Sequence, residues 1–322
     1  MKFRTEITVD RMPCLIGHKN HLMMLGSCFT SSVGEYFRRY LFDVNVNPFG
    51  TIYNPMSVAR NIRALLDKEE YTGDDLFRYN DTWLSFDHYT AFSHKNREKL
   101  LLQINDSFGP AKKIMQETDR LLITFGTAWV FRLKESGQIV CNCHKVPASR
   151  FERVLLDREI ILSEYKDLIN RLTDLNPGIK IIFTVSPVRH WKDGAHGNQL
   201  SKAILLLAID ELLASFPEHC FYFPAYELLM DDLRDYRFYA RDLLHPSEEA
   251  VDYIWEKFSS ATLSEDSLLF IRQLDPLLKT LYHRPSDPDD PVYIRLMENT
   301  SIKISQLRKA YPDAYWEKLK AF

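Results

Sequence analysis

Two segments far apart in the sequence hold side chains suited to acyl transfer. Ser27 follows Gly26 at the end of the apolar run HLMML and precedes a helical pattern. Asp242 and His245 stand three residues apart, directly before Pro246. A serine hydroxyl is a weak nucleophile until a base removes its proton, and an imidazole oriented by a carboxylate is a common base. These residue types predict nucleophilic catalysis, provided that the fold brings the two segments together.

The place of Ser27 before a helix favours this chemistry. A helix predicted from about Thr30 would direct N–H groups and positive potential at a developing oxyanion. Both segments also have a structural interpretation, because Gly-Ser after a strand and Asp-x-x-His-Pro before a helix are common turns and caps. Cys28 remains an alternative nucleophile, since a thiol is intrinsically more nucleophilic. Neighbouring side chains at such a turn point in different directions, so only one can face His245.

The surrounding elements predict an α/β fold. Short apolar stretches indicate strands, and amphipathic periodicity indicates helices between them. Such alternation is typical of a parallel sheet covered by helices on both faces, with functional groups at the carboxyl ends of the strands. The expected strands are 21–25, 43–46, 121–125, 180–185 and 220–224, and the expected helices begin near 30 or cover 55–66, 163–174, 199–215 and the stretch from Pro246.

The chain divides into two predicted parts. Residues 1–259 are expected to form the catalytic domain, interrupted at about 67–118 by an aromatic and polar insertion. Residues 260–322 have a mostly helical pattern, broken by the segment HRPSDPDDP, and predict a C-terminal helical extension.

Several motifs, in order, resemble the GSCFA family, which is placed among the SGNH (GDSL-like) hydrolases. The resemblance covers about residues 21–258, and no motif of the family is found beyond 260. It implies a three-layer α/β/α sandwich with a five-stranded parallel sheet, with Ser27 as nucleophile and Asp242 and His245 as its acid/base partners. The motifs are GSCF (26–29), NPFGTIYNP (47–55), FGTAWVF (125–131), NCHKVP (142–147), SPVRH (186–190), YFPAYE (222–227) and DLRDYRFYARDLLHPS (232–247).

The resemblance also implies an oxyanion hole, built from the N–H groups of Ser27 and Gly50 and a third donor. The usual Gly-x-Asn-Asp is replaced by Gly-Thr-Ala-Trp at 126–129, so the customary asparagine is missing. Losing such a donor costs about 3–4 kcal/mol of transition-state stabilisation. Asn142 and His144 are the candidate replacements.

Arg189 and His190 follow the fourth predicted strand and should therefore lie at the same edge of the sheet. There they could bind a polar or anionic part of the substrate, although a loop that bonds its own backbone is an equal interpretation. Cys141, Cys143 and His144 lack the paired spacing of structural zinc ligands, and no metal site is predicted.

The first functional hypothesis is an esterase or acyl hydrolase that acts on a small-molecule or carbohydrate-linked ester of a small acyl group, without metal or organic cofactor. An acyltransferase with the same triad is a close variant. A non-catalytic binding protein that retains the fold is the alternative from another class, and the missing asparagine is its main support.

The composition of the chain limits which partners are expected. The net charge is −3, from 41 basic and 44 acidic residues without a long basic run, so neither nucleic acid nor an anionic membrane is an expected partner. No apolar stretch reaches the ~20 residues of a membrane span, and the first twenty residues show no signal peptide. With an odd number of cysteines, five, these features predict a cytoplasmic protein with reduced thiols. The sequence does not indicate an oligomeric state.

Overall fold

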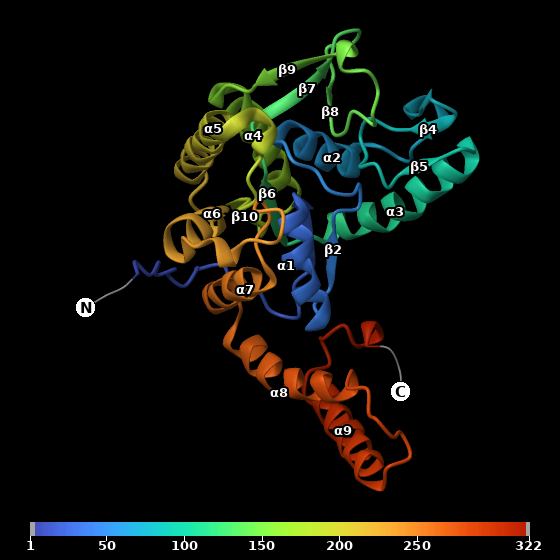
Figure 1. Ribbon diagram of the computed structural model, residues 1–322, viewed down its shortest axis with the longest axis vertical. Coiled ribbons are helices and arrows are strands. Elements are labelled where there is room, and N and C mark those ends of the chain that lie inside the picture. Colours follow the sequence, from blue (N-terminus) through green and yellow to red (C-terminus); the bar gives the residue numbers. More distant parts are fainter. Residues whose placement is uncertain (1–3, 320–322) are drawn as a thin grey trace.

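A five-stranded parallel sheet forms the centre of the computed structural model, which describes residues 4–319 (Figure 1). The strand order is β11-β10-β6-β1-β2, and every neighbouring pair is parallel. The carboxyl ends therefore meet at one edge of the sheet. The strands are β1 (Leu22–Gly26), β2 (Val44–Val46), β6 (Arg120–Phe125), β10 (Lys180–Val185) and β11 (Cys220–Tyr222).

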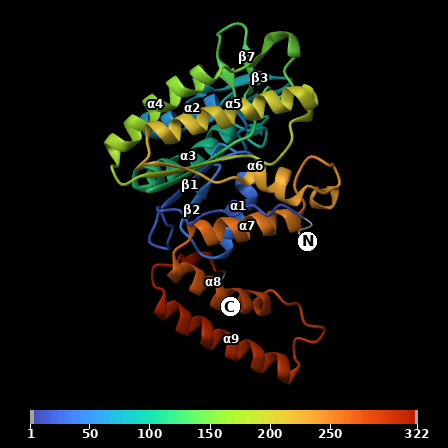
Figure 2. The same ribbon diagram turned by 90° about the vertical axis from the view of Figure 1, so that its left-hand side faces the viewer.

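The period-two alternation of a strand separates two apolar cores. In β1, Leu22 and Met24 face one core, and Met23 and Leu25 face the other. Helices α1 (Cys28–Arg39) and α7 (Glu248–Thr262) cover the first face. The opposite face is covered by α2 (Pro55–Asp67), α3 (Arg97–Glu117), α4 (Arg158–Leu175) and α5 (Gly194–Ser215). Figure 2 shows these three layers, and the predicted α/β/α fold is confirmed.

Two helix starts differ from the sequence-based expectation. Helix α1 begins at Cys28 rather than near Thr30, with Ser27 as its N-cap. Helix α7 begins only at Glu248, so Pro246 lies before the helix and not in its first turn. The reason is that the Ser247 hydroxyl accepts the Ala250 N–H at 3.3 Å and so supplies the cap.

Two small antiparallel sheets are separate from the central sheet. One lies in the predicted insertion and consists of β3 (Phe77–Tyr79), β4 (Thr82–Leu84) and β5 (Ser93–His94). Helix α3, at the end of the predicted insertion, buries Leu100 and Ile104 in the main core. The other small sheet was not predicted. It stands between β6 and α4, has the order β8-β7-β9, and consists of β7 (Trp129–Leu133), β8 (Ile139–Val140) and β9 (Phe151–Leu155).

The C-terminal segment continues from α7 as two further helices, α8 (Glu265–Leu281) and α9 (Pro291–Ala310), which lie beyond the α1–α7 layer (Figure 2). Phe270 of α8 belongs to the same apolar core as Phe37 of α1. This core therefore contains residues from both sides of residue 259. The division of the chain at that residue remains a prediction. A single turn, α6 (Ala225–Glu227), follows β11. Within residues 4–319, no helix has both the length and the apolar character to cross a membrane.

Candidate active site

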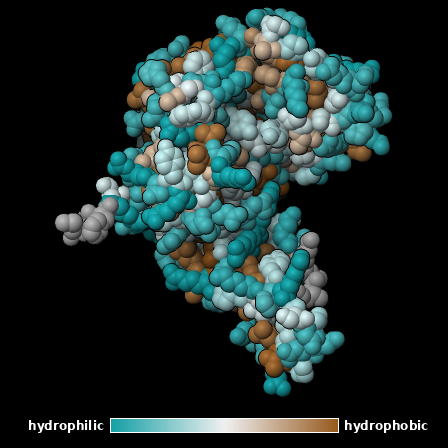
Figure 3. Space-filling view, in the orientation of Figure 1, coloured by the Kyte–Doolittle hydropathy of each residue, from teal (hydrophilic) through white to brown (hydrophobic). Residues whose placement is uncertain are grey.

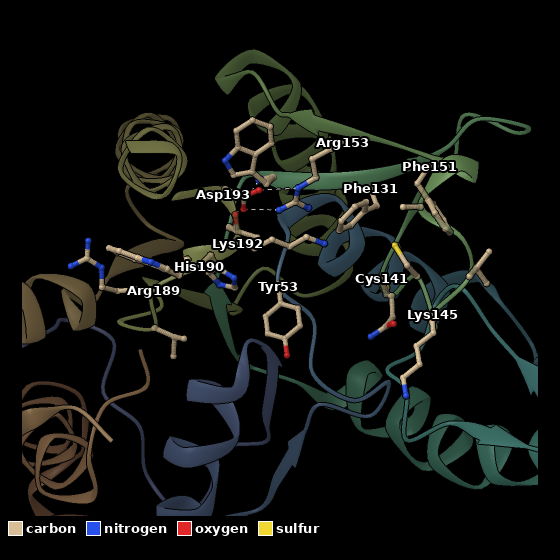
Figure 4. Close-up of a pocket in the computed structure, with 18 of the residues that line it drawn as sticks. Tyr53, Phe131, Cys141, Lys145, Phe151, Arg153, Arg189, His190, Lys192 and Asp193 are labelled. Carbon is tan, nitrogen blue, oxygen red and sulfur yellow. Dashed lines mark hydrogen bonds and ion pairs between the residues drawn. The ribbon is translucent and has the colours of Figure 1, made fainter. Parts of the chain in front are cut away.

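A cavity of about 570 Å³ opens at the carboxyl edge of the sheet (Figure 4). Tyr53 reaches it from the loop after β2, Thr127 from the loop after β6, and His190 from the loop after β10. His245 lines the same cavity from the segment before α7. Sequence segments that are almost two hundred residues apart thus meet where a parallel sheet usually places its functional groups.

The Asp242–His245 pair has the geometry of an oriented acid/base couple. The Asp242 Oδ2 atom lies 2.6 Å from His245 Nδ1, and Oδ1 accepts the N–H groups of His245 and Leu244 at 3.0 and 2.9 Å. These bonds, first of all the one from the His245 N–H, lower the pKa of Asp242 to about 2. The carboxylate is therefore ionised at neutral pH and holds the imidazole through Nδ1, which leaves Nε2 for proton transfer.

Ser27 lies at the sharp turn between β1 and α1. Its side chain is fully buried, and its Oγ has no hydrogen-bond partner among the described residues. Its own N–H donates to the Thr124 carbonyl at 3.3 Å, so this amide is not available to an oxyanion in the present conformation. Gly26 makes the turn with φ +148°, and a Cβ there would stand 2.3 Å from the Thr124 oxygen. Only glycine fits this position without strain.

Cys28 is the partly exposed neighbour of the buried Ser27. It is the first residue of α1, so its sulfur lies near the N–H groups of the first helical turn. Burial raises the pKa of the Cys28 thiol, while these N–H groups and the Lys202 ammonium act to lower it. The charge of Asp242 acts in the opposite direction and raises this pKa.

Lys202 is a buried cation that sequence reasoning missed. Its ammonium group donates to the carbonyls of Gly126 and Ser186, both at 2.7 Å, and the residue is 2% exposed. Burial lowers its pKa to about 7. Lys202 therefore ties together the loops after β6 and β10. The available signal was a lysine inside the apolar helical run SKAILLLA.

His190 lies inside the site as a neutral imidazole. Burial, followed by the charge of Lys202, lowers its pKa to about 3, and its buried Nε2 has no partner among the described residues. The ring packs edge-on against Tyr53 at 5.6 Å between centroids. A Cβ at Gly126 would come within 3.0 Å of Nε2, so the glycine makes room for the ring.

The candidate oxyanion donors are only partly brought together. Gly50 has φ +79°, and its N–H donates to the Asn47 carbonyl at 2.8 Å within a turn. His144 is buried against the insertion, where its Nε2 bonds the Ser85 carbonyl at 2.7 Å. Asn142 does line the cavity. Its Oδ1 accepts the His144 N–H at 2.8 Å, which leaves the Nδ2 amide to donate.

The residue at the position of the missing asparagine, Ala128, has a structural role. Ala128 is fully buried there, and its N–H donates to the Ser201 hydroxyl at 2.7 Å. The same hydroxyl lies 2.9 Å from Thr127 Oγ1. This loop is therefore fastened to α5 and presents no amide side chain to the cavity.

The unpredicted β8-β7-β9 sheet supplies one wall of the cavity. Trp129 and Phe131 come from β7, and Phe151 and Arg153 come from β9. Arg153 forms two hydrogen bonds with Asp193, at 3.1 and 2.7 Å. Short antiparallel strands with mixed side chains give little periodic signal, which is why these residues escaped sequence reasoning.

The strand order and the carboxyl-edge site together define an α/β protein of three layers with a parallel five-stranded sheet. The chain belongs to the GSCFA family, whose model matches residues 21–258, and the predicted family is thereby confirmed.

Solved structures of two esterases show distant similarity to this chain. One is the acetyl xylan esterase Est2A from the rumen bacterium Butyrivibrio proteoclasticus, with 10% identity, a TM-score of 0.38, and coverage of 81% of this chain and 65% of the other. The second is a carbohydrate esterase family 3 protein from Talaromyces cellulolyticus, with 8% identity, a TM-score of 0.34, and coverage of 78% and 98%. A search of the curated proteins gave no match.

Proposed function

We propose that this chain hydrolyses carboxylic esters through an acyl-enzyme formed at the β1–α1 junction, with His245 as general base. The observation that carries the proposal is the ionised Asp242 carboxylate holding His245 at 2.6 Å on the rim of the carboxyl-edge cavity. A base held in one tautomer with one free nitrogen is suited to take a proton from a nucleophile and return it to a leaving group.

Two neighbouring side chains could carry the acyl group. Ser27 is the nucleophile predicted from the sequence, but a fully buried hydroxyl cannot be reached by a substrate unless the turn moves. Cys28 is partly exposed and is the first residue of α1, where the positive end of the helix acts against the burial that raises the pKa of its thiol. We therefore propose Cys28 as the nucleophile and keep Ser27 as the alternative.

The reaction then runs in two balanced steps. His245 Nε2 takes the thiol proton of Cys28, the sulfur attacks the ester carbonyl, and the proton passes to the departing alcohol. Water next attacks the thioester, again losing its proton to His245, and releases the acid and the free thiol. Asn142 is the proposed donor to the oxyanion through its Nδ2 amide.

Small acyl groups, including those on carbohydrates, are the proposed substrates, in keeping with the names of the two similar esterases. An acyltransferase would use the same residues and differ in the acceptor, an alcohol in place of water.

Single substitutions assayed with 4-nitrophenyl acetate test the proposal. Cys28→Ala and His245→Ala should each lower kcat/KM by about 100-fold or more, because each removes a group that acts in the transition state. Ser27→Ala should change kcat/KM by less than about tenfold. Cys14→Ala, which removes a cysteine that does not line the cavity, is the control and should have no comparable effect.

The outcomes separate the candidates. Loss of activity in Ser27→Ala with retention in Cys28→Ala would assign the reaction to the serine. Unchanged activity in His245→Ala would overturn the proposal altogether. A wild-type protein that hydrolyses no ester in a broad panel would favour the binding-protein hypothesis.

A further inference from the structure

We propose that the cavity binds its substrate through an anionic group, a carboxylate or a phosphate, held by Lys192 and Arg153 above the ring of Phe131. This inference rests on the proposed function, because it takes the cavity beside His245 as the substrate site. It adds the chemical class of the substrate, an ester that carries a negative charge on its acyl or alcohol part.

The first observation is that two cations meet over one aromatic ring. The Arg153 guanidinium lies 4.3 Å from the Phe131 centroid, and the Lys192 ammonium lies 4.5 Å from the same centroid. Figure 4 shows both side chains reaching toward Phe131 inside the cavity. An anion bound beside this ring would be attracted by both groups.

The second observation is the charge balance of the wall. The described residues that line the cavity include four cations, Lys145, Arg153, Arg189 and Lys192, and one carboxylate, Asp193. Asp193 forms an ion pair with Arg153 through two hydrogen bonds, so the excess of positive charge comes from Lys145, Arg189 and Lys192. Because the whole chain has a net charge of −3, this excess of positive charge is a local property of the cavity.

Two titratable neighbours sense the same positive potential. Burial is the main cause that lowers the pKa of His190, and the charges of Lys202 and Arg153 lower it further. Burial raises the pKa of the Cys143 thiol to about 11, while Lys192 and Arg153 act to lower it.

The aromatic residues of the cavity wall indicate which kind of molecule carries the anionic group. Trp129 and Phe151 stand beside Phe131 along the cavity and offer aromatic faces. Such faces pack well against the apolar side of a sugar ring or a short acyl chain. A concave site of about 570 Å³ fits a small molecule of this kind.

Binding of three probes that share one aromatic scaffold tests the inference without any turnover. Calorimetry on the full chain would compare naphthoate, naphthyl phosphate and the neutral naphthylmethanol. Both anionic probes should bind at least about tenfold more tightly than the neutral one, and their affinity should fall with added salt. The relative affinity of naphthoate and naphthyl phosphate then identifies which anion the site prefers.

The matched variants are Lys192→Gln in the cavity and Lys113→Gln on the exposed face of α3. Lys192→Gln should weaken the anionic probes by about fivefold to tenfold and leave the neutral probe unchanged. Lys113→Gln should change neither. Equal affinity of neutral and anionic probes, equal effects of the two variants, or no binding of either anionic probe would each overturn the inference.

These results are independent of the ester assay. A protein that discriminates the anionic probes but hydrolyses no ester would retain the anion site and lose the proposed function. A protein that hydrolyses esters through Cys28 and His245 without discriminating the probes would retain the function and lose the anion site.

Discussion

Asp242 orients the His245 imidazole and places a negative charge beside it. Its two oxygens accept three bonds from the segment 244–245, and its pKa of about 2 keeps the charge at any neutral pH. Asp242→Asn keeps the size of the side chain but removes the charge that stabilises an imidazolium. We expect kcat/KM for 4-nitrophenyl acetate to fall by about 10²–10⁴-fold. The melting temperature, measured in parallel, should change little, because the pair is half exposed.

Histidines that are buried in the neutral form are expected to lower the free energy of unfolding in acid. Burial lowers the pKa of His88 to about 3, whereas a histidine in the unfolded chain titrates near its ordinary value of 6.5. Between these values the unfolded state binds the proton and the folded state does not, so the free energy of unfolding falls as pH drops from about 6.5 toward 3.

Urea denaturation at pH 7 and pH 5 measures this linkage. His88→Gln, which can retain the bond to Ser85 Oγ, should lose less stability between the two pH values than the wild-type protein. An equal loss in both proteins would show that His88 is not a source of the acid sensitivity.

At the scale of residues, the sequence predicted which polar side chains lie near the cavity better than it predicted what each of them contacts. His245, Arg189, His190 and Asn142 were predicted from their places after strands or before a helix, and all four line one cavity. Asp242, predicted in the same way, is bonded to His245. His144 was placed in the same site, yet its ring faces the insertion. The sequence could not reveal this, because the orientation of a loop side chain depends on partners that are distant along the chain.

At the scale of elements, the β1–α1 turn is the feature on which the site depends. Gly26→Ala would set a Cβ against the backbone oxygen of Thr124, which cannot move without breaking the sheet. We expect a loss of about 2 kcal/mol or more in the free energy of unfolding, measured by urea denaturation.

Gly109→Ala on α3 is the matched control. A Cβ at this position meets nothing within 4 Å, so the substitution should be neutral or stabilise by up to about 1 kcal/mol. A Gly26→Ala protein as stable as the wild type would contradict the proposed constraint on the turn.

Elements with long periodic patterns were predictable, and short ones were not. Strands β1, β6 and β10 are mainly apolar runs of five or six residues, and α4 and α5 cover 18 and 22 residues with buried faces. The β8-β7-β9 sheet has strands of two to five residues, and Phe131 pairs with Arg153 across a long connection. Pairing of this kind is decided by tertiary packing, which a local pattern does not contain.

At the scale of the whole molecule, the C-terminal helices share a core with the α/β layers. Phe270 is fully buried, with its ring 4.5 Å from His18 and 5.8 Å from Trp316. His18 in turn stacks on Phe42 at 4.0 Å. Figure 3 also shows hydrophobic residues on the surface of this region. Ile302 of α9 is one of the exposed apolar side chains.

Phe270→Ala should therefore destabilise the entire protein by about 3–5 kcal/mol in urea denaturation, because it leaves a cavity in a shared core. Leu269→Ala, at an exposed position of the same helix, should stay within about 0.5 kcal/mol. Both variants should unfold in one transition. A separate early transition in Phe270→Ala, with the rest unchanged, would show that the extension folds independently.

The central claim is that acyl transfer passes through the β1–α1 junction under the control of His245. Its most direct test is peptide mapping by mass spectrometry of protein quenched with acid during turnover of 4-nitrophenyl acetate. We expect one acetyl group on Cys28 in the wild-type protein and none in His245→Ala. An acetyl group on Ser27 would contradict the assignment of the thiol. A protein that turns over the ester with no acetyl group at either residue would contradict the account as a whole.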